Sequence, residues 1–432
     1  MVDRMTAGTA RPRKPAALVR STLALMASTG ATSVTGIVFW AVATRLFPVS
    51  AVGRASAEVS AMTLVGNIAQ LNLSSAFIRF LPRAGDRTRS VVLLSYTGCS
   101  ALAIAGSMLF LNTSLHHGIV PDGFAMQLVF TGSVVFWTIF VIQDSALVAL
   151  RSTIWVPIEN TAFGLAKLAL LPLLITAPLA EGVFFAWTIP MVFAVVGVNI
   201  LLFITIIPKS VVQISRPLAW TYSTKKALIS FVTAEYLSSL VGTSATFIMP
   251  LVIIKRLGAD AAGYFYLPWL ISASFASLLW NITAPLIVAV SHDETALPEL
   301  LRRSIRLMII LVIPSSCVVI IGAPYLLGML SHKYSAQGTG LLRLIGASFP
   351  FVAILSMAIA ALWIRTRIWL LLGIRTLRSV GLIMISIVLI GPFGLEGVGL
   401  ANLAIFGVLA VAALPGLVHW YRLNQTGPGP VS

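Results

Sequence analysis

Residues 31–46 read ATSVTGIVFWAVATRL, and residues 242–257 read GTSATFIMPLVIIKRL. The two stretches align without a gap, and the identical positions include polar residues. Unrelated apolar segments align easily at apolar positions, so the polar identities are the informative ones. After one gap the match continues, because Ala51-Val52-Gly53 corresponds to Ala261-Ala262-Gly263. The chain is therefore predicted to contain an internal repeat in which these two stretches are equivalent.

The composition places most of the chain in lipid. Apolar residues make up 58% of the 432 residues and charged residues only 10%, whereas roughly a quarter of the residues in soluble domains are charged. The apolar stretches are longer than the roughly ten alternating residues of a barrel strand. Helices are expected instead, because a helix satisfies its own backbone hydrogen bonds in lipid.

A helix needs about 20 mostly apolar residues to cross a membrane, and twelve segments of the chain meet this criterion. They are predicted at 18–46, 55–78, 90–112, 124–148, 154–177, 183–207, 227–254, 262–290, 304–330, 338–364, 369–391 and 397–421. Six predicted spans lie between the start of the first span and the start of the seventh, so both repeats have the same orientation. We therefore expect an all-α polytopic membrane protein, with about twelve helices in two parallel-repeat six-helix lobes around a central cavity.

The distribution of basic residues predicts the orientation. With a cytoplasmic N-terminus, 22 of the 29 Lys and Arg residues lie on the inner side and six on the outer side. The positive-inside rule then places both termini in the cytoplasm, and nucleic-acid binding is not expected. The expected location is the plasma (inner) membrane. The predicted parts are a basic N-terminus at 1–17, an N-lobe at 18–207, a cytoplasmic linker at 208–226, a C-lobe at 227–421 and a cytoplasmic tail at 422–432.

The sequence carries none of the common catalytic or nucleotide-binding motifs. A G-x-x-x-x-G-K-[ST] loop, an H-E-x-x-H pair and a G-x-S-x-G elbow are all absent, and the five histidines are scattered. Cys99 and Cys317 both fall inside predicted spans, which is not a disulfide or metal-binding pattern. We expect a protein without catalytic residues, a metal site or an organic cofactor.

Polar side chains are concentrated in the first, second and seventh predicted spans, and such side chains need partners or water at membrane depth. The candidates for a hydrated cavity lining are Thr32, Ser33, Asn67, Gln70, Asn72, Thr243 and Ser244. The alternative is that small hydroxyl residues only allow close helix packing.

Ionisable residues at membrane depth are expensive and therefore mark functional sites by default. The acidic candidates are Glu235, Asp144 and Glu159, each of which could bind a coupling proton or sodium ion. Lys167 lies eight residues after Glu159, too far along the helix for a direct ion pair. The basic candidates are Arg45, Arg54, Arg256 and Arg343; the alternative for Arg45 and Arg256 is an anchoring role at the interface, and Arg54 could pair with Glu58.

Four segments carry a resemblance to a known family. These are TRLFPVSAVGRASA at 44–57, RFLPRAG at 79–85, KRLGADAAGYFYLPWLISASFASLL at 255–279 and LLRLIGASFPF at 341–351. They resemble polysaccharide-transport proteins, the Wzx-type oligosaccharide flippases of the multidrug/oligosaccharidyl-lipid/polysaccharide exporter (MOP) superfamily. The resemblance implies a V of two lobes, a cavity lined by helices one, two, seven and eight, and alternating access. It further implies a polyprenyl-(pyro)phosphate-linked oligosaccharide as cargo and contacts with polysaccharide-assembly proteins.

With such a cargo, the basic and polar candidates acquire roles. Arg45, Arg54, Arg256 and Arg343 would bind the phosphate or headgroup, because a guanidinium offers forked donors to phosphate oxygens. A cation-coupled multidrug exporter on the same fold is the first alternative. A peptidoglycan lipid-precursor flippase is less favoured, because such proteins usually carry two further helices. A membrane enzyme of polymer assembly is a further alternative. It is disfavoured because such an enzyme would be expected to have a large extramembrane loop, and the sequence predicts none.

Overall fold

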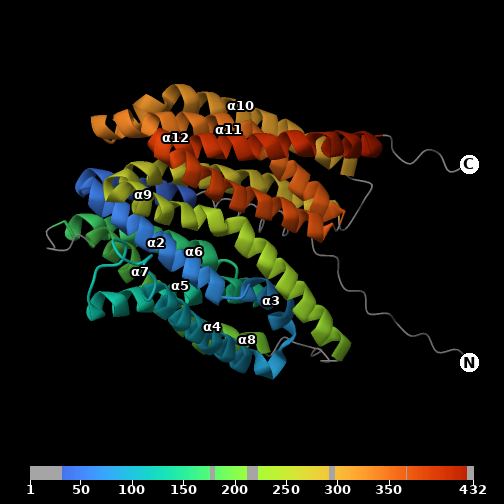
Figure 1. Cartoon of the computed structure of the whole chain (residues 1–432). Helices are drawn as coiled ribbons and strands as arrows, with labels where there is room; N and C mark the ends of the chain where they lie inside the picture. Colours follow the sequence, from blue (N-terminus) through green and yellow to red (C-terminus); the bar gives the residue numbers. More distant parts are fainter. Residues whose placement is uncertain (1–31, 176–180, 212–221, 291–296, 366, 426–432) are drawn as a thin grey trace, which may run out of the picture.

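The computed structural model describes residues 32–175, 181–211, 222–290, 297–365 and 367–425 (Figure 1). Within these residues the regular structure is helical and no strand is present, which confirms the predicted all-α class. The part of the first predicted span that precedes residue 32 lies outside the described residues.

The helices follow the apolar segments of the sequence closely. In chain order they are Thr32–Leu46, α2 Val49–Ala69, α3 Leu73–Phe80, α4 Thr88–Leu111, α5 Phe124–Ala149, α6 Trp155–Leu173, α7 Gly182–Leu201, α8 Ile207–Val211, α9 Tyr222–Val290, α10 Leu297–Gly328, α11 His332–Ile364 and α12 Ile368–Gln425. A π-helical turn at Leu202–Ile206 joins α7 to α8.

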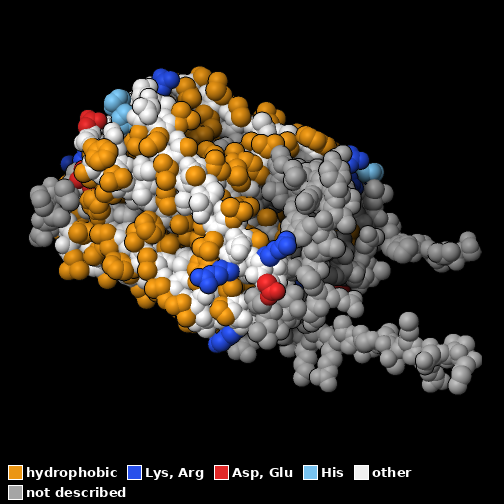
Figure 2. Space-filling view, turned by 90° about the horizontal axis from the view of Figure 1, so that it is seen from below, with side chains coloured by type: hydrophobic (Ala, Val, Ile, Leu, Met, Phe, Trp, Pro, Cys, Tyr) orange, Lys and Arg blue, Asp and Glu red, His pale blue; other side chains and the backbone are white. Residues whose placement is uncertain are grey.

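Seven helical stretches of the described chain are long and apolar enough to cross a membrane. They are Gly85–Leu111, Phe124–Ala149, Gly182–Lys209, Tyr236–Trp280, Leu297–Gly328, His332–Ile364 and Trp369–Arg422, and the helix Thr32–Leu46 is apolar but shorter. Figure 2 shows a surface on which hydrophobic side chains form large continuous areas and charged side chains are few. The chain is therefore a multi-pass membrane protein.

The two longest helices, α9 and α12, each contain one residue with non-helical geometry. Gly258 has φ 86° and ψ 178°, and Gly394 has φ 55° and ψ −132°. Trp269 Nε1 donates to the carbonyl of Thr246 at 2.9 Å, although 23 residues of straight helix would separate them by about 35 Å. Each long helix is therefore folded back on itself at a glycine, which tolerates a positive φ.

The helices form two packed groups with α9 between them (Figure 1). On one side, α11 packs against α10 and α12, and both α11 and α12 pack against α9. On the other side, α2 packs against α4, α5 and α7, and α6 packs against α7. The main contact across the molecule is between α2 and α9.

Two glycines allow α2 and the second half of α9 to touch through their backbones. A Cβ atom on Gly53 would lie 1.9 Å from the carbonyl oxygen of Ala259 and 2.7 Å from the nitrogen of Gly263. A Cβ atom on Gly263 would lie 2.5 Å from the carbonyl oxygen of Val49. Gly53 and Gly263 are the residues that the internal repeat aligns with each other. The two equivalent positions therefore meet at one crossing.

The second predicted span, 55–78, is interrupted in the structure. Leu71 and Asn72 have φ of 49° and 53°, and they separate α2 from α3. The side chains next to the break bond locally, because Ser74 Oγ donates to Gln70 Oε1 at 3.0 Å and Ser75 Oγ donates to Asn72 Oδ1 at 3.2 Å. Asn tolerates the left-handed conformation better than most residues, which explains why the break falls there.

We predict that Gly53→Ala destabilises the protein by about 1–3 kcal/mol, because the added methyl group forces two backbones apart. Gly132→Ala in α5 is the matched control, since a Cβ atom on Gly132 would have no neighbour within 4 Å, and alanine is the better helix former. Thermal unfolding of the purified protein in detergent measures both. Equal midpoints for the two variants would show that α2 and α9 are not in backbone contact.

Candidate functional site

A cavity of about 730 Å³ lies among α9, α11 and α12, with one residue of α2 at its edge. Its walls are largely apolar, with hydroxyl and basic groups among them. The aliphatic residues are Leu270, Ala273, Ala276, Val352, Leu355 and Ile359. The aromatic residues are Phe247, Tyr266, Trp269, Trp280 and Phe406; the hydroxyl residues are Ser60, Ser239, Thr243, Thr246, Ser277 and Ser356; the basic residues are Arg375 and Arg378. No Asp or Glu is among the described lining residues.

The two arginines are held by contacts across the cavity wall. Arg375 Nη1 donates to Ser238 Oγ at 2.8 Å, and Arg378 Nη2 donates to the carbonyl oxygen of Gly242. The guanidinium carbon of Arg378 lies 5.9 Å from the ring centre of Phe406. A Cβ atom on Gly242 would lie 3.3 Å from Cδ of Arg375, so the glycine leaves room for the arginine stem.

One end of the cavity stops at the crossing of α2 and α9. Tyr266, one helical turn after Gly263, lines the cavity, and its ring centre lies 4.5 Å from that of Trp40 on the helix Thr32–Leu46. From there the lining residues follow α9 away from the crossing as far as Trp280. The cavity is therefore closed at the Gly53 end and extends toward the opposite end of the helices.

The arginines predicted from sequence lie away from this cavity. Arg45 is exposed and its Nη2 donates to the carbonyl of Met329 at 2.5 Å, which joins the first helix to the end of α10. Arg343 is exposed and its Nε donates to the carbonyl of Ile320 at 3.1 Å. Arg256 is also exposed.

Arg54 and Glu58 lie one turn apart on α2. Arg54 is half-buried, whereas Glu58 is 3% exposed and its Oε2 has no hydrogen-bond partner among the described residues. No ion pair within 4 Å joins the two side chains. The two charges therefore act on each other at a distance and not through a direct ion pair.

The predicted polar lining is divided by the structure. Thr243 faces the cavity, while the hydroxyl of Ser244 donates to the carbonyl of Val241. Gln70 and Asn72 bond to serines at the break after α2. The remaining predicted lining residues, Thr32, Ser33 and Asn67, are exposed or half-buried and are not among the described lining residues. The side chain of Glu235 lies outside the described residues.

A second polar site is buried among α5, α6 and α7. Gln143 is fully buried and its Nε2 donates to Oε1 of Glu159, while Asn199 Nδ2 donates to Gln143 Oε1 at 2.6 Å. Asn160 Nδ2 donates to Asp144 Oδ2 at 3.3 Å. The carboxyl groups of Asp144 and Glu159 are also within hydrogen-bonding reach of each other. The structure thus brings together two acidic residues that the sequence predicted separately.

This cluster, which we call the acid–amide cluster (Gln143, Asp144, Glu159, Asn160 and Asn199), retains unused acceptors. Oδ1 of Asp144, Oε2 of Glu159 and Oδ1 of Asn199 are buried and have no hydrogen-bond partner among the described residues. Two neighbouring carboxylates cannot both stay charged in a water-poor site unless a cation lies between them. The arrangement can therefore bind a proton or a small cation.

Lys167 is a lone buried cation in α6. It is 3% exposed, and its Nζ lies 3.8 Å from the ring centre of Trp187, 4.8 Å from that of Phe163 and 5.2 Å from that of Phe39. The aromatic faces stabilise the cation in place of a carboxylate. As predicted, no ion pair joins Lys167 to Glu159.

Sequence reasoning missed Arg375 and Arg378, because it assigned them to the basic residues that set topology. A signal for them was present. The two residues are three apart, so they share one helix face, and they lie 6 and 9 residues after the start of the span predicted at 369–391. Both arginines therefore lie too deep in the predicted span to serve only as topology determinants at the membrane–water interface.

No known protein family and no curated protein sequence matches the chain. Solved structures do match it. An inward-facing multidrug resistance MATE family transporter of the MOP superfamily has a TM-score of 0.65 and 14% identity, over 92% of this chain and 96% of that one. The lipid II flippase MurJ in an inward closed conformation has a TM-score of 0.70 and 13% identity, over 91% of this chain and 87% of that one.

An outward-facing MATE transporter matches with a TM-score of 0.63 and 14% identity, over 95% of this chain and 97% of that one. The chain therefore has the fold of the MATE and MurJ transporters. Because one of these neighbours is a lipid flippase and the others are multidrug transporters, the fold does not select the cargo. The function has to be argued from the cavity and the charges around it.

We predict that Gln143→Leu lowers the free energy of unfolding by about 1–3 kcal/mol, because it leaves buried partners in the acid–amide cluster unbonded. Gln127→Leu is the matched control, since it makes the same change on the same helix at a half-buried position. Thermal unfolding in detergent compares the two. If Gln143→Leu is as stable as Gln127→Leu, the amide does not bridge Glu159 and Asn199.

Proposed function

We propose that the chain is a flippase that moves a polyprenyl-(pyro)phosphate-linked oligosaccharide across the plasma membrane for cell-surface polysaccharide assembly. The observation that carries this proposal is the cavity with Arg375 and Arg378 and with no described acidic lining residue. A guanidinium binds phosphate oxygens through two parallel hydrogen bonds, and its charge lowers the cost of moving phosphate through a low-dielectric region. The aromatic and hydroxyl groups beside the arginines suit the apolar faces and hydroxyls of sugars.

The architecture we propose has twelve spans in two six-helix lobes, at 18–207 and 227–421. Two observations support this count. The long helices α9 and α12 each fold back at a glycine, so each supplies two passes. The remaining passes are then the helix Thr32–Leu46, α2 with α3, α4, α5, α6, α7 with α8, α10 and α11. The repeat at 31–46 and 242–257 supports two equivalent lobes.

Both termini are proposed to be cytoplasmic, on the strength of the basic-residue distribution. This orientation puts the crossing of Gly53 and Gly263 at the outer side. The described conformation is then closed to the outside, with a cavity that extends toward the cytoplasm. Alternating access requires the helices to separate at this crossing. Arg45, Arg54, Arg256 and Arg343 would contact the phosphate or headgroup near the outer side as the cargo leaves.

The acid–amide cluster is our proposed coupling site. Asp144 and Glu159 would take up a proton, or a sodium ion, in one conformation and release it in the other. The support for this role is the set of buried oxygens without partners on three different helices. Glu235 stays a further candidate from sequence.

A multidrug exporter is the second candidate function. The observation that favours it is the similarity to MATE transporters, together with the acid–amide cluster. A peptidoglycan precursor flippase is the third, on the similarity to MurJ. In an exporter of cationic drugs, however, two arginines on the cavity wall would repel the cargo. We therefore favour an anionic lipid-linked cargo.

The proposed cargo predicts a specific phenotype. Deletion of the gene should leave lipid-linked glycan on the cytoplasmic leaflet and abolish the exported polymer, while glycan synthesis in membrane extracts continues. Impermeant periodate oxidation of intact spheroplasts measures the outer-leaflet glycan. Arg378→Leu should restore export at least tenfold less well than the wild type, because a charge-assisted phosphate contact is worth about 1.5–3 kcal/mol.

Arg306→Leu on α10 is the control, since Arg306 is exposed and outside the described cavity lining. It should restore export fully. Drug sensitivity of the deletion strain with normal polymer would favour the exporter. Lysis with an arrested cell wall would favour the peptidoglycan precursor, and loss of synthesis in extracts would favour an enzyme.

Proton coupling predicts that Glu159→Gln flattens the pH dependence of glycan export, because the variant removes one of the two carboxyl groups that share the proton. Glu299→Gln is the control at an exposed position at the start of α10. The measurement is export in proteoliposomes across a range of external pH. An unchanged profile in Glu159→Gln would show that the cluster is structural.

A further inference from the structure

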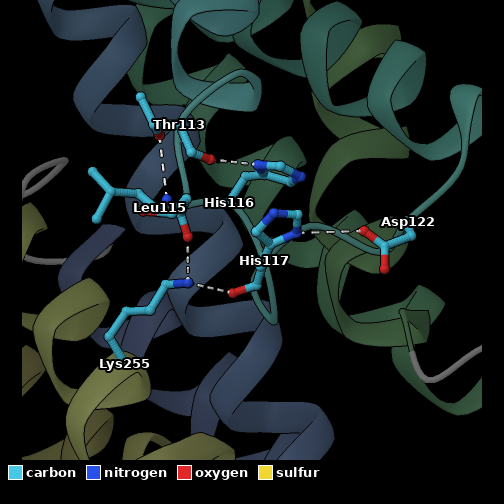
Figure 3. A network of polar contacts seen from close by, with 7 residues as sticks. Thr113, Leu115, His116, His117, Asp122 and Lys255 are labelled. Atoms are coloured by element: carbon cyan, nitrogen blue, oxygen red, sulfur yellow. Dashed lines mark hydrogen bonds and ion pairs between the residues drawn. The ribbon is translucent and has the colours of Figure 1, made fainter.

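The loop between α4 and α5 carries three ligand-type side chains close together (Figure 3). His116, His117 and Asp122 each offer one nitrogen or oxygen, and these atoms all lie within 4.8 Å of one another. His116 is 7% exposed, whereas His117 and Asp122 are exposed. This cluster lies at the closed end of the molecule and is not part of the cavity or of the acid–amide cluster.

The buried member of the cluster has the hydrogen bond that orients a metal ligand. Nδ1 of His116 lies 2.7 Å from the carbonyl oxygen of Thr113. Because a carbonyl oxygen only accepts, Nδ1 carries the proton and Nε2 keeps its lone pair. Metal-binding histidines are commonly held in this way, with one ring nitrogen bonded to a backbone carbonyl and the other on the ion. The ring of His116 also lies 4.0 Å, centre to centre, from that of His117.

The two exposed members can complete the site. Nδ1 of His117 lies 3.8 Å from Oδ1 of Asp122. Zinc binds nitrogen and oxygen ligands at about 2.0–2.2 Å, so ligand atoms around one ion are roughly 3.3 Å apart. Rotation of the exposed His117 and Asp122 side chains closes the remaining gap. We propose that His116, His117 and Asp122 bind a divalent transition-metal ion of the zinc class, with water as the fourth ligand.

One lysine joins the loop that carries the site to α9. Nζ of Lys255, on α9, donates to the carbonyl oxygens of Ser114 and His117 at 2.7 and 2.6 Å (Figure 3). Lys255 lies three residues before the fold-back glycine of α9. The carbonyls that it binds belong to the same loop as the metal ligands, and one of them belongs to His117 itself.

A metal ion at this site would act on the outer closure. The bound ion would hold the loop in the conformation in which its carbonyl oxygens accept hydrogen bonds from Lys255. Because a ligand that binds one conformation more tightly shifts the population toward it, the closed conformation would be favoured. Zinc should therefore stabilise the closed conformation and inhibit transport. This second statement rests on the proposed function, whereas the binding site itself does not.

The binding site is tested by calorimetric titration of the purified full-length protein with zinc chloride. We expect one zinc ion per chain, and at least tenfold weaker binding in His117→Asn and in Asp122→Asn. His332→Asn is the matched control, because His332 is exposed at the start of α11, away from the cluster. Failure of the wild type to bind zinc, or unchanged binding in both cluster variants, would overturn the site.

The link to closure is tested without cargo. Spin labels on cysteines introduced at Leu115 and Asp260, with Cys99 and Cys317 replaced by alanine, report the distance between the loop and α9. Zinc should shorten the mean distance between the labels and narrow its distribution in this background, and should not do so when Lys255→Met is added.

A second measurement uses the cargo. Zinc should inhibit glycan export at least tenfold less in Lys255→Met than in the wild type. If zinc binds but leaves the distances unchanged, the proposed link to closure is wrong. If zinc binds and narrows the distances but no glycan is exported, the proposed cargo is wrong instead.

Discussion

The contact between Gly53 and Gly263 is the constraint on which the arrangement of the helices depends. Backbone touches backbone there, since a Cβ atom on either glycine would overlap a neighbouring carbonyl. Small residues promote helix association in lipid because they permit this close approach. The contact joins α2 to α9, stops the cavity at one end, and brings Arg45 close to α10 and Lys255 close to the loop after α4. A conformational change that opens this end has to break a packed glycine contact and two sets of hydrogen bonds.

Three ionisable side chains at membrane depth in the described residues are compensated by different means. Lys167 is surrounded by aromatic rings, Glu159 is bonded by an amide, and Arg378 is bonded by a backbone carbonyl. Compensation is necessary because an isolated charge costs several kcal/mol at membrane depth. The surroundings of these charged groups differ, and a charge that lies beside a cavity can contact a ligand whereas an enclosed charge cannot. The two arginines lie beside a cavity, whereas Lys167 is enclosed by aromatic rings.

The fold is shared with multidrug transporters and with a lipid II flippase, so the fold by itself does not decide what the chain does. The described cavity of this chain is basic. Two arginines among aromatic and hydroxyl groups suit an anionic, sugar-bearing lipid, and they disfavour a cationic drug. The acid–amide cluster is separate from the described cavity lining, so the proposed cargo site and the proposed ion site would be coupled through helix movement.

The amino-acid sequence by itself determined the all-helical class and the membrane location, because apolar length and composition can be read from the chain without its tertiary structure. It also aligned Gly53 with Gly263. It also singled out Asp144 and Glu159. It could not show that these two residues meet, or that Arg375 and Arg378 line a cavity while Arg45 and Arg343 do not. Those facts depend on how helices rotate and pack, which is decided by contacts between residues far apart in the chain. The fold-back glycines and the break after α2 likewise depend on the tertiary structure, because a positive φ is adopted only where the surrounding helices require it.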